Sequence, residues 1–326
     1  MLELAADLVP LLAADVPVAA VTVTAVVRSA PRGVGATLAV TRDARVIGSI
    51  SGGCVENDAV MLGLDALRTG SVRRARFGFT DDGTVTPIAA GLACGGAVDV
   101  VAYPVEASAL PALEAARAGR EATVHLTLDG DPLVLHRPAL PRLLVLGAGE
   151  HAAALCRLGT AAGFAVTVCD DWALLVTAER FPDASELVVA APHEFLAALD
   201  DVDERTAVCV LTHDERLDVP ALATALRMPV GFVGAMGARA TVARRAALLR
   251  AAGVTDAELA RLHSPLGLDL GGRTPEETAL SVIAEIVASR NQASARPLRE
   301  GRGPHLHAVS DTDAEAVAAS CAVRIA

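Results

Sequence analysis

The stretch Leu143-Leu-Val-Leu-Gly-Ala-Gly-Glu-His-Ala152 decides the fold of the second half of the chain. An apolar run ends at Gly147, and a helical pattern begins at Glu150. A glycine turn between a buried strand and a helix lets the backbone approach a ligand, and the first amides of the helix favour an anion. The stretch therefore predicts the first βα unit of a Rossmann-type domain that holds a phosphate-bearing ligand.

Outward from this turn, apolar runs alternate with helical patterns across residues 142–290. The runs lie at 143–146, 165–169, 186–189, 207–211 and 230–233. Continuous apolar runs separated by helices are typical of parallel strands that are covered on both faces. The sequence predicts an α/β fold, with a Rossmann-type doubly wound parallel sheet as its C-terminal domain.

The residues before this domain show a different pattern. Residues 1–103 combine short strand runs with two helical patterns, which predicts a smaller N-terminal α+β domain. Residues 104–141 predict a linking helix and a hairpin whose turn is at Asp129-Gly130. The tail, 291–326, carries scattered proline and glycine and is expected to be partly disordered.

Composition excludes several classes of protein. The net charge is −11 and only 2% of residues are aromatic, so no surface for nucleic acid is expected. All 28 basic residues are arginine, which rules out a P-loop lysine, a Schiff base and a Tyr-Lys catalytic pair. The longest apolar run is too short to cross a bilayer and no secretory signal is evident, so we expect a cytoplasmic protein without a membrane partner.

Several residues near the predicted carboxyl edge of the sheet are candidate ligand contacts. Gly147 and Gly149 would hold a phosphate. Asp170, 23 residues past Gly147, would either accept hydrogen bonds from an NAD-like ribose or cap the local backbone. Three further candidates, each weighed against a solvated or packing role, are His151, His213 and Arg239.

Two cysteines in the N-terminal domain each lie beside a Gly-Gly pair. These are Cys54, at the start of a predicted helix, and Cys94. Glycine pairs permit close approach to a ligand, and a helix N-terminus favours the thiolate, which binds soft metals. The alternative is a pair of small buried residues in turns, which is the role expected of Cys156, Cys169 and Cys209 in the Rossmann core.

The motifs together resemble the XdhC/CoxI family, the xanthine dehydrogenase accessory proteins. The stretches that carry the resemblance are Gly48-Ser-Ile-Ser-Gly-Gly-Cys-Val-Glu56, Gly91-Leu-Ala-Cys-Gly-Gly96, Leu146-Gly-Ala-Gly149, Leu211-Thr-His-Asp214, Val233-Gly-Ala-Met-Gly-Ala-Arg239 and Ser264-Pro-Leu-Gly-Leu-Asp-Leu-Gly-Gly-Arg-Thr-Pro-Glu-Glu277. Glu150 departs from the small residue or histidine that relatives often have after the glycine turn.

The resemblance implies a chaperone that binds molybdenum cofactor, as molybdopterin in its mononucleotide or dinucleotide form. It implies that a cysteine desulfurase partner installs the sulfido ligand while the cofactor is held. Delivery would be to an apo-molybdoenzyme of the xanthine dehydrogenase or carbon monoxide dehydrogenase type, by a homodimer. A pterin phosphate on the glycine turn, with Cys54 and Cys94 as molybdenum contacts, is compatible with this role.

Two other functions remain open at this stage. Gly147, Gly149 and Asp170 would suit an NAD-dependent oxidoreductase, although no hydride-transfer residue is evident. Cys54 and Cys94 would suit a thiol-based redox or metal sensor. The sequence identifies no catalytic residue, and it favours a cofactor chaperone over a catalyst.

Overall fold

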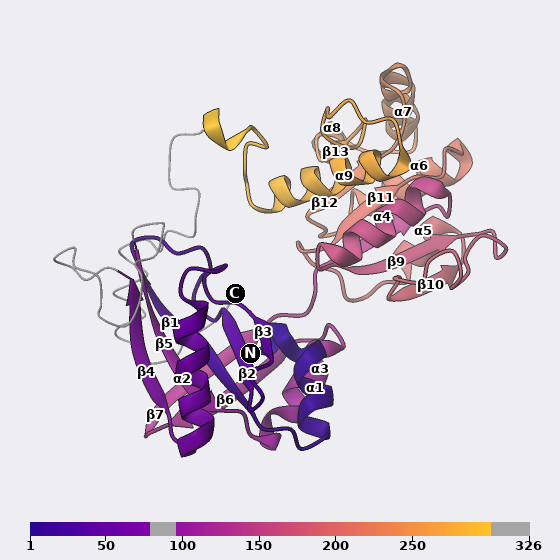
Figure 1. The fold of residues 1–326 in the computed structure, drawn as a ribbon. Coiled ribbons are helices and arrows are strands. Elements are labelled where there is room, and N and C mark those ends of the chain that lie inside the picture. Colours follow the sequence, from indigo (N-terminus) through magenta and orange to yellow (C-terminus); the bar gives the residue numbers. More distant parts are fainter. Residues whose placement is uncertain (79–95, 301–326) are drawn as a thin grey trace. The chain divides into compact units, whose positions relative to one another are not determined.

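The computed structural model describes residues 1–78 and 96–300, and Figure 1 shows their fold. The chain divides into two compact units, Met1–Ala139 together with the residues from Leu298, and Leu140–Pro297. The segment predicted to link the domains thus groups with the first unit up to Ala139. The tail from residue 301, for which disorder is expected, lies outside the described residues. No helix in the described ranges is long and apolar enough to span a bilayer.

The first unit is built on a five-stranded antiparallel sheet in the order β3-β2-β1-β5-β4. Its strands are β1 (Val18–Val27), β2 (Thr37–Thr41), β3 (Val46–Gly48), β4 (Arg73–Gly78) and β5 (Ala97–Pro104). The long central strand β1 is buried over most of its length because both faces of the sheet are covered.

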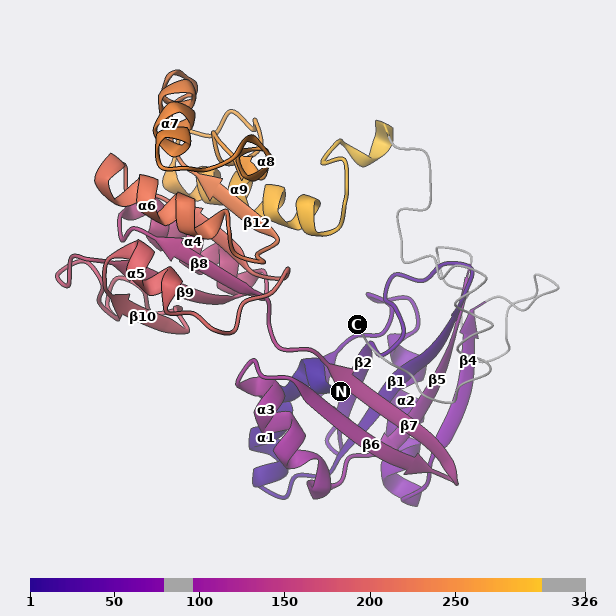
Figure 2. The ribbon, with the colours of Figure 1, turned by 180° about the vertical axis from the view of Figure 1, so that it is seen from behind.

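Alternate residues of β1 face two separate hydrophobic cores. Ala19 and Val21 pack with α2 (Glu56–Thr69), whereas Val18 and Ala20 pack with the other helices. The elements that pack on the face of the sheet opposite α2 are η1 (Leu2–Leu4), α1 (Ala5–Ala13), η2 (Ala107–Ala109), α3 (Leu110–Arg117), β6 (Ala122–Leu128) and β7 (Asp131–Arg137). Figure 2 shows the β6–β7 hairpin across the face opposite α2. The strand period of two therefore divides the unit into three layers.

The hairpin turn lies where the sequence predicts it. Asp129 and Gly130 both have positive φ, 55° and 91°. Two such residues form the tight turn that matches the twist of antiparallel strands.

The second unit is a six-stranded parallel sheet in the order β10-β9-β8-β11-β12-β13. Its strands are β8 (Arg142–Leu146), β9 (Ala165–Asp170), β10 (Glu186–Val189), β11 (Ala207–Val210), β12 (Phe232–Ala235) and β13 (Leu262–His263). Counted from β8, this is the order 3-2-1-4-5-6 that is typical of a Rossmann fold. The predicted doubly wound sheet is confirmed. The sixth strand was not predicted because its two residues show no apolar run.

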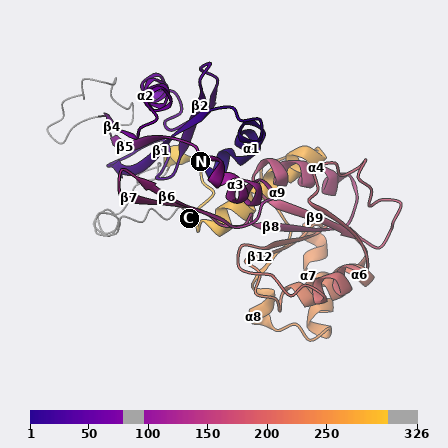
Figure 3. The same ribbon diagram turned by 90° about the horizontal axis from the view of Figure 1, so that it is seen from below.

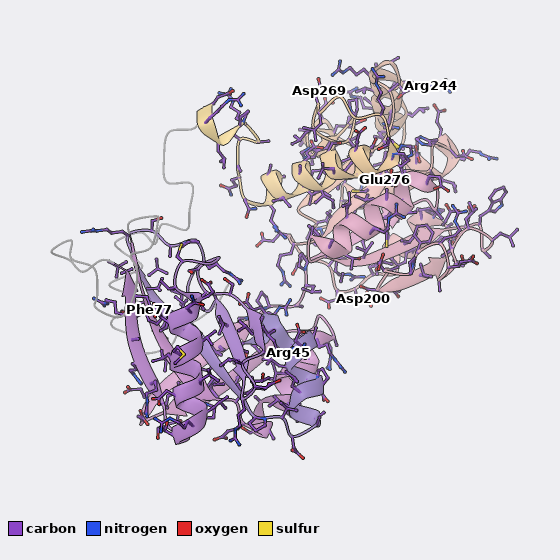
Figure 4. The ribbon with its side chains drawn as sticks, viewed as in Figure 1. Arg45, Phe77, Asp200, Arg244, Asp269 and Glu276 are labelled. Atoms are coloured by element: carbon purple, nitrogen blue, oxygen red, sulfur yellow. The ribbon has the colours of Figure 1, made fainter. Side chains whose placement is uncertain are left out.

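Helices cover both faces of this sheet (Figure 3). One face packs against α4 (Glu150–Ala161) and α9 (Pro275–Arg290). An ion pair of 2.9 Å between Arg157 of α4 and Glu276 of α9 also joins these two helices, and Figure 4 labels Glu276. The remaining helices of this unit are α5 (Pro192–Ala197), α6 (Glu215–Ala225), α7 (Arg239–Ala251) and α8 (Asp256–Leu259), and the short helix η3 (Leu298–Glu300) falls outside it. Of these, α5, α6 and α7 contribute to the core on the opposite face.

Side chains of the central strand β8 are buried in the core of the second unit. Leu144 is fully buried, whereas Leu174 is 88% exposed. We expect Leu144→Ala to lower the free energy of unfolding by about 2–5 kcal/mol, since it removes buried methyl groups and leaves a cavity. Leu174→Ala is the matched control and should change it by less than about 0.5 kcal/mol. Urea unfolding measures both, and equal effects would contradict the assigned core.

Candidate functional site

The glycine turn after β8 lies against the segment that follows β11. The Gly147 amide donates a hydrogen bond of 2.8 Å to the Cys169 carbonyl, and the φ of Gly147 is +113°. A Cβ at this position would lie 3.0 Å from the carbonyl carbon of Leu211 and 3.1 Å from the Thr212 nitrogen. Only glycine fits here. The turn occupies the point at which strand order reverses, where open α/β sheets bind ligands.

The helix that begins after this turn has a free N-terminus. Gly149 is the N-cap of α4 and provides no side-chain cap. A Cβ at Gly149 would meet nothing within 4 Å, so the space beside it is open. The amides of the first helical turn lack intrahelical acceptors, and the helix dipole favours negative charge there. These features could hold a phosphate.

Asp170 serves the backbone around the turn. Its Oδ2 accepts a hydrogen bond of 2.8 Å from the Ala148 amide, and its Oδ1 accepts one of 2.9 Å from the Trp172 amide. The residue is buried. This geometry favours the capping interpretation over a contact with a ribose.

Arg180 supplies positive charge beside the turn, which the sequence did not reveal. Its guanidinium donates a hydrogen bond of 3.2 Å to the Ala148 carbonyl and lies 3.5 Å from the Glu150 carboxylate. Its Nε is buried and has no hydrogen-bond partner in the described part of the chain. Arg180 comes from the irregular connection between β9 and β10 and belongs to no motif, so no sequence signal pointed to it. His151, on the first turn of α4, is half-buried.

A second feature of the same sheet edge is a pocket of about 270 Å³ between α6 and α7. His213 is exposed at this pocket and has a φ of +67°, a strained conformation for a residue other than glycine. Asp218 and Arg245 also line the pocket. Both were missed, although each lies on the apolar face of a helical pattern.

Arg239 lies outside the residues that line this pocket. It is 85% exposed and makes a 3.5 Å ion pair with Asp269, in the segment before α9 (Figure 4). Asp170 and His151 thus lie at the glycine turn, His213 lies at the pocket and Arg239 is exposed to solvent.

The loop that carries Cys54, before α2, is held in place by hydrogen bonds to the Glu56 carboxylate. The Glu56 side chain accepts hydrogen bonds from the hydroxyls of Ser49 and Ser51, each 2.6 Å, and from the Gly53 amide at 2.7 Å. The Ser51 hydroxyl oxygen in turn accepts from the Cys54 amide at 3.0 Å. Gly52 and Gly53 both have positive φ, 76° and 124°, which the tight path of this loop requires.

These contacts perturb Glu56 itself. Partial burial opposes ionisation, but hydrogen bonds from Ser49, Ser51 and Gly53 outweigh it and lower the pKa of Glu56 to about 2. The carboxylate therefore stays charged and keeps the loop closed over the whole physiological range.

Cys54 is half-buried with a free thiol. Cys94, its predicted counterpart, lies outside the described residues. Within those residues no group of three or more histidine, cysteine or acidic side chains could hold a metal ion. Burial raises the pKa of Cys156 to about 11 and that of Cys169 to about 12, which fits their predicted place in the core.

The segment that begins at Ser264 joins three parts of the second unit. The Leu266 amide donates to the Ala235 carbonyl at 3.1 Å, and the Gly267 amide donates to the Glu285 carboxylate at 2.7 Å. Gly267 has a φ of +104°, and a Cβ there would clash with Ser281 of α9. This motif anchors β12 to α9.

Comparisons with known proteins match both units of the chain. A model described as the XdhC Rossmann domain matches residues 143–286, and one described as the XdhC and CoxI family matches residues 11–78. A probable xanthine dehydrogenase subunit from Bacillus subtilis is 30% identical over 47% of the chain and 44% of its own length. The Escherichia coli molybdenum cofactor insertion chaperone PaoD is 27% identical over 80% of both chains.

A crystal structure of a xanthine dehydrogenase from Bacillus halodurans superposes with a TM-score of 0.72 at 23% identity, covering 91% of this chain and 99% of that one. This likeness shows the fold. The chain spans 41% and 44% of the lengths of two of the curated relatives it matches.

The close approach at Gly147 can be tested by substitution. Gly147→Ala should lower the free energy of unfolding by about 1–3 kcal/mol, since it combines positive φ with contact against the Leu211–Thr212 backbone. Gly149→Ala, for which a Cβ meets open space, is the control and should cost less, about 0.5 kcal/mol, because alanine is a poorer N-cap than glycine. Chemical denaturation measures both variants. A Gly147→Ala protein as stable as Gly149→Ala would show that the turn is not constrained.

The perturbed Glu56 predicts a pH dependence. Because its pKa is lowered from 4.5 to about 2 in the folded state, its stabilisation is complete above pH 4.5 and is lost as pH falls toward 2. We expect Glu56→Gln to be less stable than the parent by about 1 kcal/mol at pH 7, after allowance for solvent screening, and by less at pH 3. Urea unfolding at both pH values measures the gap; a gap independent of pH would contradict this assignment.

Proposed function

Because the chain belongs to the XdhC and CoxI family, we propose that it binds molybdenum cofactor and inserts it into an apo-molybdoenzyme of the xanthine dehydrogenase type. The observation that carries this proposal is the match to an insertion chaperone, PaoD, over 80% of both chains. The chain acts as a chaperone rather than as a catalyst, and the molybdenum centre supplies redox chemistry only in the client enzyme.

The glycine turn of the second unit is the proposed phosphate site. Gly147 and Gly149 leave the first amides of α4 open, and Arg180 brings a guanidinium whose buried Nε lacks a partner within the described residues. A terminal phosphate or a nucleotide pyrophosphate would accept hydrogen bonds from these amides. His151 and His213 are further proposed contacts, and Arg239 would meet the ligand only if its ion pair with Asp269 opened.

Cys54 is the proposed contact for molybdenum, with Cys94 as its counterpart from the sequence pattern. A thiolate is a soft ligand that suits this metal. The Glu56 hydrogen bonds hold the loop that carries Cys54, and they leave its thiol free. The described residues show no closed set of metal ligands, which suits a cargo that has to be released.

The proposal also includes a partner enzyme, a cellular location and an oligomeric state. The cofactor is held while a cysteine desulfurase supplies the sulfido ligand, in the cytoplasm, by a homodimer. The backbone hydrogen bonds of Asp170 give this carboxylate a structural role at the turn, so its presence does not by itself favour the NAD-dependent alternative.

The cysteine assignment is tested by the metal and pterin content of protein purified from a host that makes the cofactor. Cys54→Ala should lower molybdenum and fluorescent oxidised pterin per chain by about tenfold, since it removes a soft ligand from a residue at the edge of the core. Cys156→Ala, which alters a buried thiol of the second unit, is the control and should retain both.

Unchanged molybdenum and pterin content in Cys54→Ala would contradict the role of the Cys54 thiol as a molybdenum contact. A parent protein that contains neither molybdenum nor pterin would overturn the proposed function itself.

A further inference from the structure

The pocket between α6 and α7 contains a buried carboxylate with an unused oxygen. Asp218 has a side chain only 7% exposed. Its Oδ1 accepts a hydrogen bond from the Thr212 hydroxyl. In the described part of the chain its Oδ2 accepts none, and the nearest cation, Arg245 Nη2, lies 3.8 Å away, beyond hydrogen-bonding distance. The side chain is buried, but Oδ2 is not among the fully buried atoms that lack a hydrogen bond in the described residues, so this oxygen is accessible from the pocket and can accept a hydrogen bond from a ligand.

Arg245 adds donors beside this acceptor. Its side chain is 11% exposed, and it is held by hydrogen bonds to the Ser264 hydroxyl at 2.7 Å and the Met236 carbonyl at 2.6 Å. A guanidinium carries more N–H groups than these two bonds use. The floor of the pocket therefore presents an acceptor and a donor side by side.

The walls and the size of the pocket restrict the ligand. Val219 and Leu248 supply apolar walls, and the volume of about 270 Å³ is near the small end of ligand sites. A flat heterocycle fits such a space. A phosphate would be repelled by Asp218 and by Glu215 at the same pocket. A metal ion would need more oxygen ligands than the described residues bring together.

We infer that this pocket binds a 2-amino-4-oxopyrimidine ring, the edge that pterins and guanine share, with Asp218 accepting from its N–H groups and Arg245 donating to its carbonyl. The ring edge offers donors next to an acceptor, which complements the pocket floor. The choice of a pterin over guanine rests on the proposed function.

Thr212 connects the pocket with the glycine turn. Its backbone nitrogen is one of the atoms that a Cβ at Gly147 would meet, and its hydroxyl bonds Asp218. The phosphate site and the ring site are thus neighbours on one sheet edge. A ligand with a ring at one end and a phosphate at the other could occupy both.

Calorimetric titration of the full chain with neopterin, guanosine and adenosine tests this assignment. We expect neopterin to bind, and Asp218→Asn to weaken it by at least about tenfold, because the substitution replaces the free acceptor by a donor. The asparagine can still accept from Thr212 but loses the 3.8 Å ion pair with Arg245, so the melting temperature should fall while the variant stays folded at the temperature of the titration. Asp131→Asn, which makes the same change at an exposed aspartate of the first unit outside this pocket, is the matched control and should bind as the parent does.

The outcomes distinguish a pterin from a guanine ligand, and they also distinguish failure of this inference from failure of the proposed function. Stronger binding of guanosine with the same dependence on Asp218 would support the pocket and assign it to the guanine of a nucleotide. Equal binding of adenosine, no binding of any probe, or binding that Asp218→Asn leaves unchanged would overturn the inference. Molybdenum content of the purified parent is measured independently, so the proposed function can fail while the probe titrations stand.

Discussion

The second unit depends on one steric constraint, the close approach of Gly147 to the Leu211–Thr212 backbone. Strands β8 and β11 are adjacent and parallel, and the chain leaves both at the same edge. With no side chain at Gly147, the two departing segments can come into contact, and α4 can begin immediately beyond. The same contact positions Thr212, whose hydroxyl then reaches Asp218. The open helix terminus and the small pocket are therefore consequences of a single glycine at the crossover of the sheet.

The acidic residues near the proposed sites differ in what they do. Glu56 and Asp170 accept hydrogen bonds from backbone amides and hold their loops in place. Asp214 caps α6 and pairs with Arg216. Asp218 is the exception, since burial raises its pKa despite the Thr212 hydroxyl, while its Oδ2 accepts no hydrogen bond from the described residues and has only a 3.8 Å ion pair with Arg245. Three of these acids therefore have structural roles, whereas the Asp218 carboxylate has an oxygen that could accept a hydrogen bond from a ligand.

The fold was largely predictable because its signals are local. The glycine turn at Gly147, the apolar runs and the Asp129–Gly130 hairpin each reflect a preference of a few neighbouring residues. Roles that depend on tertiary contacts were not predictable. The capping role of Asp170 is set by where the Ala148 amide lies. Arg180 reaches the turn from an irregular connection, and Asp218 and Arg245 meet across two helices, so spacing along the chain carries no trace of either arrangement.

The Ser49–Glu56 loop has a consequence for binding kinetics and affinity. All the hydrogen bonds that the Glu56 side chain accepts come from residues within seven positions of it, so the loop is closed by its own sequence. The conformational entropy of ordering it is lost when the unit folds, and not when cargo arrives. A preorganised loop can capture cargo without rearranging. In the proposed role, the loop would also release cargo without first unfolding, so fast exchange would not require a loss of its folded structure.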